Sequence, residues 1–550
     1  MRKRSRSWTS LVTVAALGVA GLASALPTGA QPAEAGGQPR VTAAAPTAAE
    51  VSTTLVGDLE ARGFQVSPGY PMLWGQGACQ TNLFPALQSC LGNNPVSPYV
   101  IPVFKAWPDE YVGPTPPNAF GDVLPGYTPV YRLAPRDAMV FFGKMPPAGK
   151  FMGLQAFVWS QPGRWKKKDY DRWAATADRP YPMEYLFQTI PPDDPKADRT
   201  VSWSSFGDSV NNAVMQNQSG EPWGEDRYVI TTPSAATAQA VSGALVARGV
   251  PAEDIFIEQV PGRDSLGPIG PLGMGKDAVD FYSFFRYALP TDPIAAKQWW
   301  TDLPLTVMRV RPPSSLGPVQ RYGMATYGER TARSEAYLAD DLANLVDGVC
   351  DSVGLAGLHS ADCAQPAPAS SVMPDPKSDY GWNAAYCRQV HMWCGDISDA
   401  GLLWSGPLPL DSGQTYAVVG TLATETGNAT YVGLGVNDAS TFLSPTGVTD
   451  SQLKGSALGY GSAVNHAEKF FVHYYSRTCT DLANVPGYPD SCTPLTPEMV
   501  PRTGTPDAMG HPALLGMFWP GLRDYMLPDS EHGPDTSKLL RPRILTFTQP

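Results

Sequence analysis

The chain has 550 residues, 43% of them hydrophobic, and a formal net charge of −11. The hydrophobic content is sufficient for packed cores, and a chain of this length favours two or more domains. The acidic balance excludes nucleic acid as an expected partner, because proteins that bind phosphate backbones present clustered lysine and arginine side chains.

The N-terminus has the parts of a secretory signal peptide. Basic residues within 2–6 precede an apolar run at 11–26, and residues 33–35 have the Ala-x-Ala form of a cleavage site. We expect residues 1–35 to be removed and the mature protein to be secreted and extracellular. An N-terminal membrane helix is the alternative, although the apolar run is short for one. No later stretch is long and apolar enough, so we expect no membrane span in the mature chain.

Two segments follow the predicted signal peptide. Residues 36–50 are rich in Ala, Thr and Pro and predict a flexible tether. Residues 51–310 mix strand-like and helix-like patterns, which is typical of an αβ domain. Apolar runs predict strands in this domain at residues 99–104, 138–142 and 151–159.

A β-α-β unit is the clearest element of this domain. Residues 227–232 predict a strand, Ser234 predicts the N-cap of a helix, and Gly249 predicts the stop of that helix. Residues 255–260 then predict a second strand, which a crossover connection places parallel to the first. The apolar stripe of the helix consists of Ala238, Val241, Ala244 and Leu245.

The rest of the chain divides into a connection and a second domain. Residues 311–376 are a Pro-rich connection with one amphipathic helix, whose apolar positions run from 338 to 349. Residues 377–550 have a β-rich pattern, in which 416–423 and 431–436 predict an antiparallel hairpin. The expected class is therefore α+β: a mixed αβ N-terminal domain with a βαβ unit, followed by a β-rich, disulfide-bonded C-terminal domain.

The eight cysteines fall into neighbouring pairs along the sequence. An even number of cysteines in an exported chain indicates disulfides. We expect the pairs Cys79–Cys90, Cys350–Cys363, Cys387–Cys394 and Cys479–Cys492. A zinc site is the alternative, with His391 as its nearest candidate ligand, but the cysteines lack C-x-x-C spacing. We therefore expect neither a metal site nor a bound cofactor.

Three short blocks contain residue types that could form a catalytic site. They are residues 206–209 (Phe-Gly-Asp-Ser), 435–438 (Gly-Val-Asn-Asp) and 529–532 (Asp-Ser-Glu-His). A serine hydroxyl is a weak nucleophile at neutral pH and needs an adjacent base, which a histidine can supply. The same residues are also common in turns and at strand ends, so a structural role is the alternative.

The blocks and their order resemble those of the GDSL, or SGNH, family of serine hydrolases. The resemblance implies that Ser209 attacks an ester carbonyl while His532 accepts its proton. It also implies that Asp529 orients His532, and that Asn437 and the Ser209 N–H stabilise the oxyanion. The substrate class so implied is a small-molecule or lipid ester.

The expected function is therefore that of a secreted serine hydrolase, of esterase or lipase type, acting on ester bonds outside the cell. The leading alternative is a non-catalytic extracellular binding or envelope-associated protein. A carbohydrate-active protein is a third class, which rests only on the aromatic content, and large aromatic side chains more commonly fill cores.

Overall fold

The computed structural model describes residues 46–548 with internal gaps. The gaps are residues 75–97, 114–122, 167, 169–188, 191–197, 326, 356, 359–362, 364–366, 369–383, 393, 441–443, 462, 481–484, 486–489 and 504–514. The predicted signal peptide at 1–35 and the predicted pair Cys79–Cys90 lie outside the described residues.

A twelve-stranded mixed sheet forms the first part of the chain. Its strands are β1 (Gln65–Leu73), β2 (Tyr99–Lys105), β3 (Tyr127–Thr128), β4 (Ala138–Lys144), β5 (Gly149–Pro162), β6 (Thr189–Ile190), β7 (Arg199–Ser205), β8 (Val210–Asn211), β9 (Asp226–Thr232), β10 (Ile255–Gln259), β11 (Asp280–Pro290) and β12 (Leu305–Arg311). They follow the order β10-β9-β4-β12-β1-β2-β11-β5-β7-β6, with β3 beside β2 and β8 beside β5. Together with the helices and smaller sheets below, this sheet confirms the predicted α+β class.

The predicted β-α-β unit is confirmed at β9, α6 and β10. The helix α6 (Ala235–Val246) begins after Ser234, whose side chain accepts a hydrogen bond from the Thr237 N–H at 3.3 Å. The chain turns after the helix at Gly249, whose φ of 89° is free of strain only for glycine. The strand β10 then pairs in parallel with β9 as its direct neighbour, as expected for a crossover connection.

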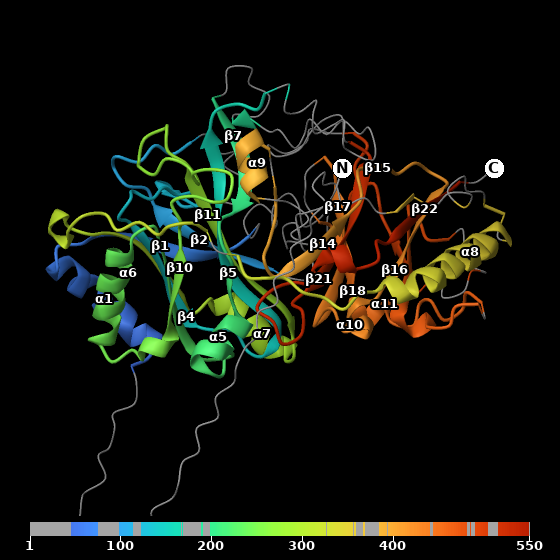
Figure 1. The fold of residues 1–550 in the computed structure, drawn as a ribbon, viewed down its shortest axis with the longest axis horizontal. Helices are drawn as coiled ribbons and strands as arrows, with labels where there is room; N and C mark the ends of the chain where they lie inside the picture. The colour runs from blue at the N-terminus through green and yellow to red at the C-terminus, as the bar shows by residue number, and fades with distance from the viewer. Residues whose placement is uncertain are drawn as a thin grey trace, which may run out of the picture. The chain divides into compact units, whose positions relative to one another are not determined.

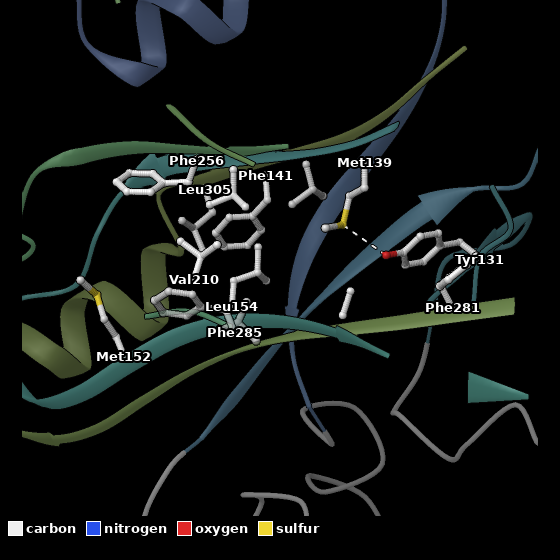
Figure 2. Packing of buried hydrophobic residues seen from close by; sticks show 14 of the residues in the cluster. Tyr131, Met139, Phe141, Met152, Leu154, Val210, Phe256, Phe281, Phe285 and Leu305 are labelled. Atoms are coloured by element: carbon white, nitrogen blue, oxygen red, sulfur yellow. Dashed lines mark hydrogen bonds between the residues drawn. The ribbon is translucent and has the colours of Figure 1, made fainter. Parts of the chain in front are cut away.

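The large sheet curls so that β10 faces β5. The Ala156 N–H of β5 donates a hydrogen bond of 2.6 Å to Glu258 of β10, although several strands separate the two in the sheet order. Side chains from both regions share one core, in which Figure 2 shows Phe141, Leu154 and Phe285 packed together. All three are at most 1% exposed, so the protein's own side chains fill this face of the sheet.

Two helices cover the opposite face at the β9–β10 end. The helices α1 (Ala48–Ala61) and α6 lie side by side (Figure 1). Leu55 of α1 and Val241 of α6 are fully buried in one cluster with Ile230 of β9. Because a capping box at Thr47 starts α1, helical structure begins within the segment predicted as a tether. Two further helices are α5 (Asn212–Ser219) and α7 (Pro293–Asp302).

The second part of the chain contains two five-stranded sheets. Their strands are β13 (Ala367–Pro368), β14 (Ala400–Trp404), β15 (Leu408–Pro409), β16 (Gln414–Thr421), β17 (Tyr431–Asp438), β18 (Thr446–Thr449), β19 (Phe470–Ser476), β20 (Cys492–Pro494), β21 (Met517–Tyr525) and β22 (Arg543–Thr548). The orders are β13-β22-β16-β19-β20 and β14-β21-β17-β18, with β15 beside β21. The sheets pack face to face, since the buried rings of Tyr416 and Phe518 lie 5.2 Å apart.

The predicted hairpin between residues 416–423 and 431–436 is wrong. The strands β16 and β17 belong to different sheets, and each pairs with two other strands. The link between them forms the short helix α10 (Ala423–Thr426), which ends at Gly427 with a φ of 76°. This helical turn carries the chain from one packed sheet to the other, so the two strands become neighbours across the core instead of within a sheet.

The predicted amphipathic helix and three of the predicted disulfides are confirmed. The helix is α8 (Ala339–Leu355), and Leu345 and Val349 are fully buried in a cluster with residues of β16 and β19. The disulfides are Cys350–Cys363, Cys387–Cys394 and Cys479–Cys492. Two short helices of the same part are α9 (Ala384–Val390) and α11 (Asp450–Leu453).

The two parts share a core, and residues 45–550 form one compact unit. Phe151 of β5 packs against Tyr525 of β21, with 5.0 Å between ring centroids. The domain limits expected from the sequence stay predictions. In the described part of the chain, no helix has the length and apolar character needed to cross a membrane.

Candidate functional site

Ser209 lies at a buried junction between the two parts of the chain. It follows β7 in a short turn and directly precedes β8, and it is 4% exposed. Its N–H donates to Ser398 Oγ at 3.0 Å, and its Oγ donates a short hydrogen bond to Asp399 Oδ1. The acceptor of the Ser209 hydroxyl is therefore a carboxylate and not the predicted base, His532.

A buried arginine holds Asp399. The Oδ2 atom of Asp399 forms an ion pair with Arg286 Nη2, and both side chains are fully buried. The Arg286 guanidinium also lies 5.1 Å from the ring centroids of Phe151 and Phe284, a cation–π arrangement. Burial alone would lower the pKa of Arg286, but the charge of Asp399 and nearby tyrosines outweigh it and raise that pKa. Arg286 is thus a permanent cation with Asp399 as its counter-ion.

Asn211 joins this ion pair to the third sequence block. Its Nδ2 donates to Asp399 Oδ1 at 2.7 Å, and it lies 3.2 Å from Ser209 Oγ. The same nitrogen lies 2.8 Å from the Glu531 carbonyl oxygen, 320 residues away in the sequence. Its Oδ1 caps the first turn of α5, which fixes the amide. The first and third blocks are therefore brought together by one side chain.

His532 contacts Asp208, the residue before Ser209. Its Nε2 lies 3.1 Å from Asp208 Oδ2, which also accepts the Gly328 N–H at 2.7 Å. Burial would lower the pKa of His532, but the hydrogen bond and the negative charge of Asp208 outweigh burial and raise that pKa. A β-carbon at Gly328 would overlap the imidazole ring, so the backbone of this glycine forms one wall of the histidine site.

The structure places Asp208, and not the predicted Asp529, against the imidazole of His532. Asp208 accepts its hydrogen bond, whereas Asp529 is exposed in a left-handed turn with a φ of 61°. No hydrogen bond between Asp529 and the imidazole is described. Asn437 lies in β17, and the described hydrogen bonds of Ser209 and His532 go to other residues. The oxyanion role of Asn437 stays a prediction.

The residues around Ser209 and His532 form a cluster with a buried interior and a partly exposed rim, and the two differ in chemistry. In the interior, Asp399 accepts hydrogen bonds from Ser209 and Arg286 away from water, whereas Arg286 Nε and Nη1 have no hydrogen-bond partner among the described residues. At the rim, the side chains of His532 and Asp208 are 11% and 26% exposed, so both are open to solvent. The described residues include no group of three His, Cys, Asp or Glu side chains that could hold a metal ion.

Sequence reasoning missed Arg286, Asp399 and Asn211. One signal for Arg286 was present, because it interrupts the aromatic run of residues 281–287, and a charge within such a strand needs a buried counter-ion. No local pattern identifies Asp399 as that counter-ion, since 113 residues separate the two.

Comparisons with known proteins do not identify a family. No family model matches the chain, and neither does any curated protein. An uncharacterised protein of Burkholderia cenocepacia has a solved structure that aligns over 83% of this chain and 77% of its own, with 8% identity and a TM-score of 0.31. The VPA0106 protein of Vibrio parahaemolyticus aligns over 76% of this chain and 87% of its own, with 10% identity and a TM-score of 0.31. Similarity at this level identifies neither a shared fold nor a function.

Proposed function

We propose that the mature chain acts outside the cell as a non-catalytic binding or envelope-associated protein. The observation that carries this proposal is the state of the Ser209 hydroxyl, which donates to Asp399 while Arg286 pairs with the same carboxylate. An ester carbonyl must approach a nucleophilic Oγ closely, and a hydroxyl that is buried and already bonded is poorly placed for that approach. Ser209 then serves to join the two parts of the chain.

Export is the second element of the proposal. Residues 1–35 have the pattern of a signal peptide. The three disulfides of the described residues are of a kind that persists in oxidising compartments and is rare in the cytosol. A binding protein needs no cytoplasmic cofactor, so a binding role fits an oxidising compartment outside the cytosol.

A secreted serine hydrolase is a second candidate, because two of the predicted blocks meet. His532 contacts Asp208, the neighbour of Ser209, and Asn211 lies between Ser209 and the Glu531 carbonyl. In this candidate the Ser209 hydroxyl turns away from its present acceptor and gives its proton to His532. Asp208 would then take the orienting role first expected of Asp529.

An ester-hydrolysis assay separates the two candidates. We expect the purified protein to hydrolyse p-nitrophenyl acetate no faster than its Ser209→Ala variant, because Ser209 is not a nucleophile. We also expect Ser209→Ala to lower the free energy of unfolding by about 1–2 kcal/mol, since Asp399 loses one hydrogen-bond donor. The exposed Ser315→Ala is the matched control and should change neither quantity. Hydrolysis that Ser209→Ala abolishes and Ser315→Ala retains would favour the hydrolase.

A further inference from the structure

A cavity of about 450 Å³ lies where β4 ends and where β9 and α1 begin. Its walls include Lys144, Glu225, Asp226, Arg227, Tyr228 and Asp254. Its volume is within the range of small-molecule sites, which starts at about 300 Å³. The Ser209 network consists of Ser209, Asn211, Arg286 and Asp399. None of these residues lines the cavity, so the cavity is separate from the site described above.

Tyr228 presents a polar group that the described residues do not satisfy. It is 1% exposed, and its buried hydroxyl oxygen has no hydrogen-bond partner among them. Its ring stacks on Phe142 with 5.3 Å between centroids, which fixes its direction. Burial raises the pKa of the Tyr228 phenol, and the charges of Asp226 and Asp254 raise it further. The hydroxyl belongs to a residue that lines the cavity, and its missing partner points to a bound acceptor.

Groups of both charge signs surround the same cavity. Lys144 and Glu225 are exposed, and no hydrogen bond or ion pair is described for either side chain. Asp226 accepts the Ala48 N–H at 2.7 Å through Oδ2, and no partner is described for its Oδ1. In the described part of the chain, the cavity thus offers a free ammonium group and free carboxylate oxygens besides the Tyr228 hydroxyl.

We infer that this cavity binds a small zwitterion of the α-amino acid type. The ammonium group of the ligand lies between Glu225 and Asp226, and its carboxylate accepts from the Tyr228 hydroxyl and Lys144 Nζ. A ligand with both charges satisfies the donors and the acceptors together, whereas a simple cation or a simple anion leaves one set unpaired. An α-amino acid ligand specifies what the proposed binding protein binds, so this inference rests on the proposed function.

Matched probes test this assignment on the purified protein. L-Alanine carries both charges, L-alaninol keeps only the ammonium group, and propionate keeps only the carboxylate. We expect L-alanine to raise the Tm as its concentration increases, and each of the other probes to give less than half that shift. Isothermal titration calorimetry should show that Tyr228→Phe weakens L-alanine binding by about tenfold, because the ligand carboxylate loses one hydrogen bond.

Two control measurements show whether the effect of Tyr228→Phe is specific to ligand binding. Without a probe, Tyr228→Phe should retain or raise the wild-type Tm, because it removes a buried hydroxyl that lacks a partner. Tyr337→Phe makes the same change at a tyrosine that is 57% exposed, and it should leave L-alanine binding unchanged. Equal shifts with all three probes, no shift with L-alanine, or unchanged affinity in Tyr228→Phe would overturn the inference. None of these measurements depends on ester hydrolysis, so failure of this site is distinguishable from failure of the proposed function.

Discussion

Replacing Arg286 with methionine is expected to lower the free energy of unfolding by about 3–5 kcal/mol. The arginine side chain is fully buried, and it pairs with Asp399, which is also fully buried. Methionine is long and flexible but uncharged, so it leaves the Asp399 carboxylate in the interior without its cation. Urea unfolding of the variant beside the wild type, followed by circular dichroism, measures the loss.

A double-mutant cycle shows whether the lost charge pair causes the effect. Adding Asp399→Asn to Arg286→Met removes the unpaired carboxylate, so the double variant should be more stable than Arg286→Met alone. The exposed pair Lys454–Glu425 provides the control, since its side chains are 62% and 27% exposed. There Lys454→Met should cost less than about 1 kcal/mol. If Arg286→Met lowered the free energy of unfolding as little as Lys454→Met does, this result would contradict the structural importance of the Ser209 network.

Glu258→Gln is expected to flatten the pH dependence of stability between about pH 4.5 and pH 7. Burial raises the pKa of Glu258 from 4.5 to about 7, although the hydrogen bonds from Thr231 and Ala156 act in the opposite direction. The fold therefore favours the protonated acid. Its contribution to stability is complete below the unfolded pKa and is lost as the pH rises through about 7. A shift of this size corresponds to about 3 kcal/mol.

The measurement is the free energy of unfolding at a series of pH values from 4.5 to 8. The wild type should lose about 3 kcal/mol more than Glu258→Gln across this range, whatever the other titrating groups contribute to both proteins. Glu253→Gln, at an exposed position just before β10, is the matched control and should follow the wild type. Parallel curves for the wild type and Glu258→Gln would show that Glu258 is ionised in the folded protein at neutral pH.

Elements with complete local signals were predictable from the sequence. The β9–α6–β10 unit has its cap at Ser234, its apolar stripe and its stop at Gly249 within one short stretch. The disulfides were predictable because their spacing is local. The hairpin prediction failed because residues 424–428 suit both a turn and a helical turn. The sheet that each strand joins is decided by packing across the core, which no local pattern contains.

The site was predictable only in part. The sequence blocks around Ser209 and His532 do lie close together. The residues that form hydrogen bonds to Ser209 and His532 could not be predicted from the spacing of residues in the sequence. Asp208 was inside the first block, but the family pattern assigns the orienting role to Asp529. Asp399 has no motif at all, because the fold alone brings it to Arg286 and Ser209.

Reaction with a fluorophosphonate tests the structural role of Ser209 most directly, since this reagent phosphonylates activated serine hydroxyls. The purified protein is incubated with the reagent, and its intact mass is compared with that of Ser209→Ala treated in the same way. We predict no adduct on Ser209, because its hydroxyl is buried and donates to Asp399. An adduct of one reagent per chain that is absent in Ser209→Ala would contradict the structural role and identify Ser209 as a nucleophile.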